Sequence, residues 1–176
     1  MDLRVQKTRN SIINAFIELL SRKPIEKITI KELTDIALIS KATFYLHFKD
    51  IYDLSEYLEN ELLESIIKDI PHPEYLVTSP REGIREITTS FSAHSQMVNI
   101  LFSRNRTTLL LERLEPKLKE LIFKKFPEYK NHLEAEILLT VLIQGDFHAY
   151  AQFSESNFDE TVDVLGRISE CLITNF

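Results

Sequence analysis

The sequence predicts an all-α fold, and three observations predict it. Apolar residues recur at three- and four-residue intervals along most of the 176-residue chain, which is the spacing of one helix face. Only three glycines are present, whereas the tight turns of all-β folds depend on glycine. Hydrophobic residues make up 44% of the chain and there is one cysteine, a composition that excludes a disordered chain and a disulfide scaffold.

The first helix is expected over residues 4–22. Ile12, Phe16 and Leu20 follow one another at four-residue intervals, so they should share one buried face. Pro24 cannot continue a helix, and the helix should therefore end just before it.

Two short helices are expected next, separated by a turn of about three residues. Thr29 and Glu32 have the spacing of a capping box, which marks the start of the first short helix. Ser40 is placed to cap the second, in which Phe44 and Phe48 form an inward-facing pair. Two helices joined by so short a turn are typical of a helix-turn-helix.

The rest of the chain is expected to be helical apart from one proline-marked linker at about 71–80. Asp50 and Asp53 suit the positive end of a helix that runs to about residue 70. Pro116 is expected either to kink a helix or to lie in the first turn of a new one. The helices expected after the linker cover residues 81–94, 96–103, 107–125, 131–153 and 158–174.

The segment 131–153 is apolar on nearly all sides, which indicates that more than one of its faces is covered. A chain of this length has little else to cover it, so we expect a homodimer through the helices at 131–153 and 158–174. The longest apolar stretch, residues 137–143, is too short to span a membrane. The N-terminus lacks the apolar core of a secretory signal and the lone Cys171 suits a reducing compartment, so a cytoplasmic protein is expected.

Charge is distributed unevenly along the chain, whose net charge is −6. Residues 1–50 carry nine basic and six acidic side chains, a net charge of +3, whereas residues 51–176 carry 12 basic and 21 acidic ones, a net charge of −9. This asymmetry indicates a basic module attached to an acidic body.

The outward surface of the second short helix is polar, aromatic and partly cationic. With Phe44 and Phe48 directed inward, the residues left outside are Lys41, Ala42, Thr43, Tyr45, Leu46 and His47. Such a surface supplies donors for phosphates and base edges and methyl contacts for thymine, as the DNA major groove requires. The alternative interpretation is an ordinary helical hairpin with no nucleic-acid function.

These residues resemble a known family, the tetracycline-repressor (TetR) family. The resemblance lies in RVQKTRNSIINAFIELL and ITIKELTDIALISKATFYLHFKDIYDL, which together span about residues 5–58, and SKATFYLHFKD is its most specific part. Within the family the chain is most similar to the branch that contains regulators associated with dihydroxyacetone kinase genes. The resemblance implies a helix-turn-helix DNA-binding domain at 1–49 and a helical regulatory and dimerisation domain at 50–176.

The resemblance also implies residue roles. Lys41 and Ala42 would face bases, and Thr29 would donate to a phosphate. Further contacts, mostly with phosphates, would come from Thr43, Tyr45 and His47. Lys7 and Arg9 either approach the DNA backbone or belong to a solvated helix end.

Two positions depart from the family pattern. Leu38 stands where the family usually has glycine, so we expect either a strained left-handed residue, at a cost of about 1 kcal/mol, or a rearranged turn. Ile51 stands where the family favours lysine, so the corresponding phosphate contact would be lost or would move to Lys49.

The implied function is sequence-specific transcriptional regulation, with a ligand-responsive repressor acting as a homodimer on a pseudo-palindromic site in double-stranded DNA. The alternative is a helical adaptor or co-regulator that acts through a protein partner, because the same branch includes such regulators. The sequence has no nucleotide-binding glycine loop and no catalytic motif, so neither enzyme activity nor a cofactor is expected.

Candidates for an effector site lie in the second half of the chain. They either line a ligand cavity or belong to the core, and they are Phe91, His94, Met97, Phe102 and Tyr150. Arg104 and Arg106 either receive an anionic ligand or belong to a solvated loop. Asp146 and His148, two residues apart on a helix, diverge and cannot both hold one ion, so no metal site is expected there.

Overall fold

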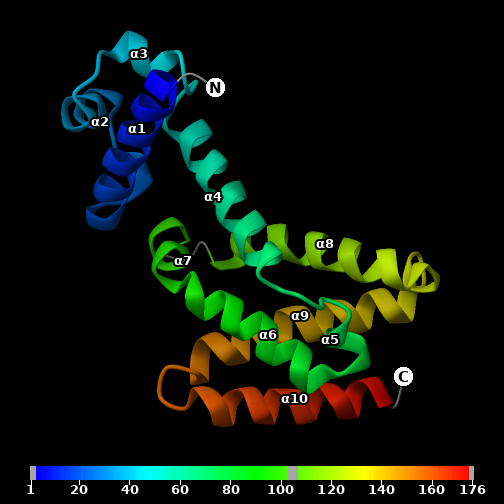
Figure 1. The fold of residues 1–176 in the computed structure, drawn as a ribbon. Helices are drawn as coiled ribbons and strands as arrows, with labels where there is room; N and C mark the ends of the chain where they lie inside the picture. Colours follow the sequence, from blue (N-terminus) through cyan, green and yellow to red (C-terminus); the bar gives the residue numbers. More distant parts are fainter. Residues whose placement is uncertain (1–2, 103–106, 175–176) are drawn as a thin grey trace. The chain divides into compact units, whose positions relative to one another are not determined.

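The computed structural model describes residues 3–102 and 107–174, and these residues are all-helical (Figure 1). They form ten α-helices and two short 3₁₀ helices, and neither described range contains a strand. The predicted all-α class is therefore confirmed. Arg104 and Arg106 lie outside the described residues.

The chain forms two compact units, which are described separately. The first comprises Met1–Leu62 and Gln96–Ser103, and the second comprises Leu63–Ser95 and Arg104–Phe176. The boundary at Leu62 and Leu63 falls inside helix α4 (Ile51–Lys68), whereas the domain boundary expected at residues 49–50 lies at the start of that helix.

The first unit is built around its N-terminal helix. Its other elements are η1 (Ile25–Lys27), α2 (Ile30–Ala37), α3 (Lys41–Tyr45), the first part of α4, and most of α7 (Ser95–Leu101). The N-terminal helix α1 (Leu3–Arg22) begins and ends close to the predicted positions, and its apolar stripe is buried at Ile12 and Phe16. The inward pair Phe44 and Phe48 is buried as well, as predicted.

Helix α3 is shorter than predicted, because it ends at Tyr45 instead of continuing to residue 48. The backbone tightens at this point: the N–H of His47 donates to the carbonyl of Phe44 at 2.9 Å, an i to i−3 bond typical of a 3₁₀ turn. Leu46 keeps a right-handed helical backbone, so its side chain still follows the helical spacing.

The second unit contains the longer helices. Its elements after α4 are α5 (Tyr75–Thr78), α6 (Pro80–Ala93), α8 (Thr107–Lys125), η2 (Pro127–Tyr129), α9 (Leu133–Phe153) and α10 (Phe158–Thr174). Helix α5 falls within the predicted linker, and α8 runs through Pro116 without a break. The last two helices match the predicted spans within about two residues.

Helix α6 packs against α5 and α10, and two glycines allow the close approach (Figure 1). A Cβ atom on Gly83 would lie 2.5 Å from the backbone nitrogen of Leu76, and one on Gly166 would lie 2.9 Å from the Cα of Arg81. Ion pairs add to the contact between α6 and α10, including Arg81 with Glu170 at 3.0 Å. Neither glycine has an unusual backbone; both are needed for space.

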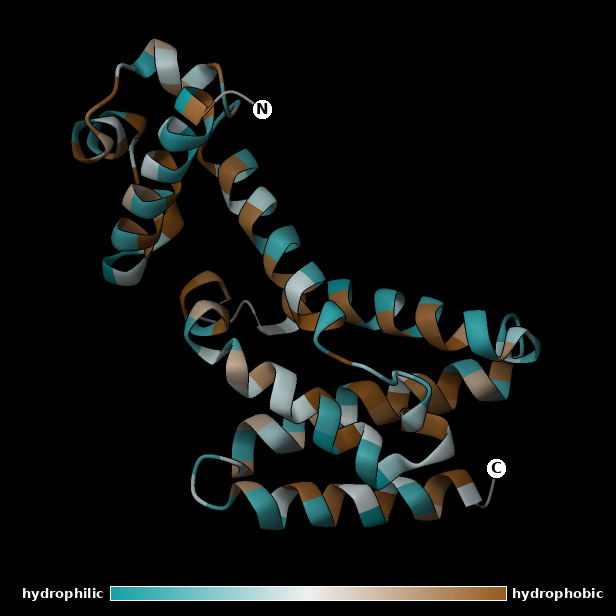
Figure 2. Cartoon of the chain, in the orientation of Figure 1, coloured by the Kyte–Doolittle hydropathy of each residue, from teal (hydrophilic) through white to brown (hydrophobic). Residues whose placement is uncertain are grey.

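Helix α9 is apolar on two faces, as the sequence indicates (Figure 2). One face is buried between α8 and α10 at Leu139 and Leu142, whereas Leu133, Ile137 and Val141 are exposed on the other. No helix among the described residues combines the length and the apolar character that crossing a membrane requires.

Candidate nucleic-acid interface

The turn between α2 and α3 depends on a left-handed leucine. Leu38 has φ 54° and ψ 45°, the conformation that glycine adopts without a steric cost. The N–H groups of Leu38 and Ile39 both donate to the carbonyl of Thr34, which closes the end of α2. Of the two expectations for this position, the structure shows the strained residue, and the Leu38 side chain is 90% exposed.

Helices α2 and α3 are both capped by the predicted hydroxyl groups. Thr29 Oγ1 accepts from the N–H of Glu32 at 3.2 Å, and Ser40 Oγ accepts from the N–H of Thr43 at 3.0 Å. The Glu32 carboxylate forms an ion pair with Nζ of Lys23, a tertiary contact that its place in a capping box does not predict. Thr29 is exposed, and its hydroxyl hydrogen remains available for a further bond.

One face of the α3 segment is exposed and faces away from the core. It consists of Lys41, Ala42, Tyr45, Leu46 and Lys49, all of them exposed, and we call it the α3 face. Lys41, Ala42, Tyr45 and Leu46 have the spacing i, i+1, i+4 and i+5, which places them on one side of the helix, and Lys49 lies in the bend that follows it. The buried Phe44 and Phe48 occupy the opposite side.

Other predicted DNA-contacting residues lie beside this face. Thr43 is half-buried, and its hydroxyl lies 2.8 Å from that of Ser40. His47 follows the end of α3 and is half-buried, with its ring centroid 6.5 Å from that of Phe48. Ile51 is buried, so the position where the family favours lysine belongs to the core of this chain.

Arg9 of α1 holds the α3 segment against α4. Its guanidinium carbon lies 4.1 Å from the ring centroid of Tyr57 and 5.3 Å from that of Phe48, both within cation–π range. Its Nε is buried, and it has no hydrogen-bond partner within the described residues. Burial raises the pKa of the Tyr57 hydroxyl, and the positive charge of Arg9 opposes that rise. The sequence gives no signal for this stacking, because the rings are 39 and 48 residues away.

The acidic residues next to the α3 face, Asp50 and Asp53, accept hydrogen bonds from backbone N–H groups at the start of α4. Asp50 Oδ1 accepts from the N–H of Asp53 at 2.8 Å, and Asp53 Oδ2 accepts from the N–H of Lys49 at 2.9 Å. These two bonds satisfy two backbone donors and place both carboxylates at the positive end of the helix. One oxygen of each carboxylate is therefore committed to a backbone N–H group.

The five candidate effector-site residues do not gather in one place. Phe91 and Tyr150 line a cavity inside the second unit, together with Leu142 and Asp146. Its volume is about 30 Å³, room for about two water molecules. The other three are elsewhere: His94 Nε2 is 2.9 Å from Oδ2 of Asp69, and Met97 and Phe102 belong to the first unit.

Asp146 is a partly buried carboxyl group between α9 and α10. It accepts a hydrogen bond from the Ser169 hydroxyl at 3.0 Å. Burial raises the pKa of Asp146 to about 7, and the Ser169 hydrogen bond opposes the rise only in part. His148 Nδ1 instead donates to the carbonyl of Gln144 at 2.8 Å. In the described part of the chain no three His, Cys, Asp or Glu side chains are grouped so that they could hold a metal ion.

No protein-family model matches this chain, and no curated protein sequence matches it.

Proposed function

We propose that this protein is a sequence-specific DNA-binding regulator of transcription, in which α2, the Leu38 turn and α3 form the helix-turn-helix. The α3 face is the observation that carries the proposal. A short helical segment with a buried aromatic side and an exposed, lysine-flanked outer side has the dimensions and chemistry that a major groove accepts. The resemblance of residues 5–58 to the TetR family supports the same reading.

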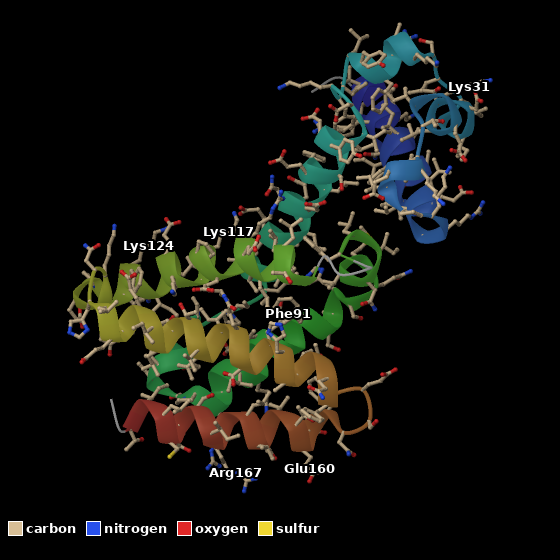
Figure 3. The ribbon with its side chains drawn as sticks, turned by 180° about the vertical axis from the view of Figure 1, so that it is seen from behind. Lys31, Phe91, Lys117, Lys124, Glu160 and Arg167 are labelled. Atoms are coloured by element: carbon tan, nitrogen blue, oxygen red, sulfur yellow. The ribbon has the colours of Figure 1, made fainter. Side chains whose placement is uncertain are left out.

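Charge and packing support a polyanionic ligand. Lys41 and Lys49 are exposed residues at the start of α3 and in the bend after it. Lys31 lies on the exposed side of α2 (Figure 3). Nearby Asp50 and Asp53 are bound to backbone N–H groups. The ring contacts of Arg9 fix the segment that presents the lysines, so little ordering would be needed when DNA binds.

A second copy of the chain is the partner proposed for α9 and α10. Leu133, Ile137 and Val141 form an exposed apolar stripe on α9, and Ile168 and Leu172 are exposed apolar residues of the adjacent helix α10. Exposed apolar rows of this extent on adjacent helices are typical of interaction sites. Homodimerisation would present two α3 faces, and the DNA site would then be a pseudo-palindrome.

Gly145 favours this partner, because it leaves an exposed point of α9 without a side chain. A Cβ atom on Gly145 would meet no atom within 4 Å, so the glycine is not needed for packing within the chain. It follows Val141 by one helical turn on the exposed side, where a second helix could approach closely.

Regulation by a small molecule is supported by fewer observations than DNA binding or dimerisation. The cavity lined by Phe91 and Tyr150 holds about two waters as it stands, so an effector larger than that must displace side chains. The proposal therefore rests on DNA binding and dimerisation, and it assigns no effector.

Leu38 favours a second candidate function, a co-regulator that binds another protein. A large apolar side chain that is 90% exposed and held in a strained conformation has no stabilising role within its own unit. An apolar pocket on a protein partner would account for it.

The test is a selection from a random-sequence DNA duplex pool, followed by binding measurements over a salt series. We expect enrichment of an inverted repeat and a steep loss of affinity with salt. The double variant Lys41→Ala/Lys49→Ala should abolish the enrichment. A matched double variant in the other unit, Lys124→Ala/Lys130→Ala, should retain it. If the wild type enriches no sequence and does not retain DNA at low salt, the DNA-binding proposal is wrong and the co-regulator is favoured.

A further inference from the structure

The centre of the α3 face is apolar, and Leu46 is its largest fully projecting group. Its side chain is 84% exposed, although Leu is a residue that proteins usually bury. Tyr45, its neighbour, packs its ring edge against Phe44 with centroids 5.6 Å apart, so Tyr45 has a role in the unit's own packing. Nothing in the packing of the first unit accounts for the exposure of Leu46.

Ala42 extends the apolar centre by one helical turn. Ala42 and Leu46 are four residues apart, both are exposed, and Leu46 retains a right-handed helical backbone. Their methyl groups therefore lie along one line of the α3 face. Lys41 precedes this pair in the first turn of α3, and Lys49 follows it in the bend after the helix, so an exposed lysine stands before and after the apolar pair along the chain.

We propose that Leu46, with Ala42 beside it, is a specificity-determining residue that contacts the C5-methyl group of a thymine in each half of the DNA site. The inference rests on the proposed DNA-binding function and names what this surface would read. Among the groups that bases present in the major groove, the thymine methyl is the apolar one. Lysine side chains before and after the apolar pair suit the phosphates that flank a groove.

The charge of the face argues against an apolar protein surface as the occupant. Such a surface would have to remove water from Lys41 and Lys49, at a cost that hydrophobic contact with Leu46 does not recover unless acidic partners are also supplied. A DNA groove offers the phosphates and the methyl group together. The occupant that matches the whole face is therefore double-stranded DNA that carries thymine.

The test replaces thymine with deoxyuridine, one position at a time, in the duplex selected by the wild-type protein. This change removes one methyl group and leaves every hydrogen-bonding group in place. For the wild type we expect one position in each half-site where the replacement weakens binding about fourfold, the value for one buried methyl group. Replacing both should weaken binding about 15-fold.

The same series with Leu46→Ala gives the decisive comparison. The variant should bind the thymine duplex more weakly and should lose its sensitivity to deoxyuridine at that position, because the partner of the methyl group is gone. Since Leu46 is exposed, the substitution should leave urea unfolding unchanged. Leu38→Ala is the matched control: it also removes an exposed leucine of the first unit, but from outside the α3 face, and it should keep the wild-type sensitivity.

The possible outcomes separate the inference from the proposed function. If the wild type selects a duplex but Leu46→Ala shows the same deoxyuridine sensitivity as the wild type, the role of Leu46 is wrong and DNA binding stands. If the Leu38→Ala control loses the sensitivity instead, the methyl contact belongs to the turn and the inference is overturned. If the wild type selects no DNA, the proposed function and the inference fail together.

Discussion

Both compact units expose large apolar side chains. In the first unit the neighbouring charged side chains are lysines, whereas in the second unit they are mostly acidic. In the first unit Leu46 lies between Lys41 and Lys49 on a short segment. In the second, Ile137 and Val141 lie on a helix of 21 residues that contains no lysine or arginine. The acidic side chains of that helix and of α10 would repel a polyanion.

This difference shows that exposed apolar surface does not by itself identify a partner. A short apolar strip between cations suits DNA, whereas a long apolar stripe beside carboxylates suits another protein surface. The charge around each surface, and the length over which it extends, decide between the two. Changes at the α9 and α10 surface should therefore alter the oligomeric state, whereas changes at the α3 face should alter DNA binding and leave the dimer intact.

The largest expected effect is loss of the dimer. Ile137→Glu/Ile168→Glu places two charges on the exposed stripe of α9 and α10, and sedimentation at micromolar concentration should change from dimer to monomer. Binding to the selected inverted repeat should fall by about 100-fold or more, because two half-sites no longer bind as one unit. Lys130→Glu, an exposed charge change on the same unit, should remain dimeric; a monomeric wild type would contradict the two-fold model.

Next in size is the effect of pH through Asp146. The pKa of Asp146 is raised from 3.8 to about 7, so the folded state holds a proton that the unfolded state releases between these values. Stability from this group is present below about pH 4 and is lost as pH rises through 7. Asp146→Asn should raise the free energy of unfolding at pH 8 on the order of 2–4 kcal/mol. At pH 4 the same substitution should leave the free energy of unfolding nearly unchanged.

Urea unfolding at several pH values measures this effect. Asp163→Asn is the control, because Asp163 is an exposed residue of α10 whose carboxylate pairs with Arg85 at 3.1 Å. Its effect should be small and nearly constant above pH 5. Equal pH profiles for wild type and Asp146→Asn would show that the Asp146 carboxyl is hydrated in solution.

Substitutions of the two lysines of the α3 face, Lys41 and Lys49, should affect DNA binding in different ways. Lys41→Ala should cost about 1–3 kcal/mol on the selected duplex and less on scrambled DNA, because it loses a base contact. Lys49→Ala should weaken both duplexes similarly and lower the salt slope by about two in a dimer, because it loses one phosphate contact per subunit. His47→Ala should weaken both duplexes without a change in slope. Anisotropy titrations over a salt series distinguish them; equal losses on both duplexes for Lys41→Ala would contradict its placement.

The smallest effect is expected at the turn. Leu38→Gly removes the cost of a left-handed leucine and loses almost no buried surface, so it should stabilise the protein by about 0.5–1 kcal/mol in urea unfolding. Leu38→Ala keeps the Cβ atom and should change stability little. If glycine and alanine behave alike, the strain at this turn is smaller than its backbone angles indicate.

The sequence by itself determined the helices and most of their ends. Ser40 and Asp50 cap their helices through hydrogen bonds with residues three positions away, and Phe44 and Phe48 share a buried side through helical spacing. Such interactions depend on neighbours within one or two turns, so the order of residues is enough to predict them.

The tertiary structure decided where these helices place their side chains relative to distant ones. Arg9 stacks on Tyr57, Met97 belongs to a different unit from Phe91, and Asp146 is buried against Ser169. Each depends on residues 6 to 48 positions apart, on elements whose packing the local pattern does not specify. Leu46 is the clearest case: its spacing predicts an outward direction, but only the packed unit shows that no other element covers it. Burial is a property of the whole fold, and the partner proposed for Leu46 follows from that property.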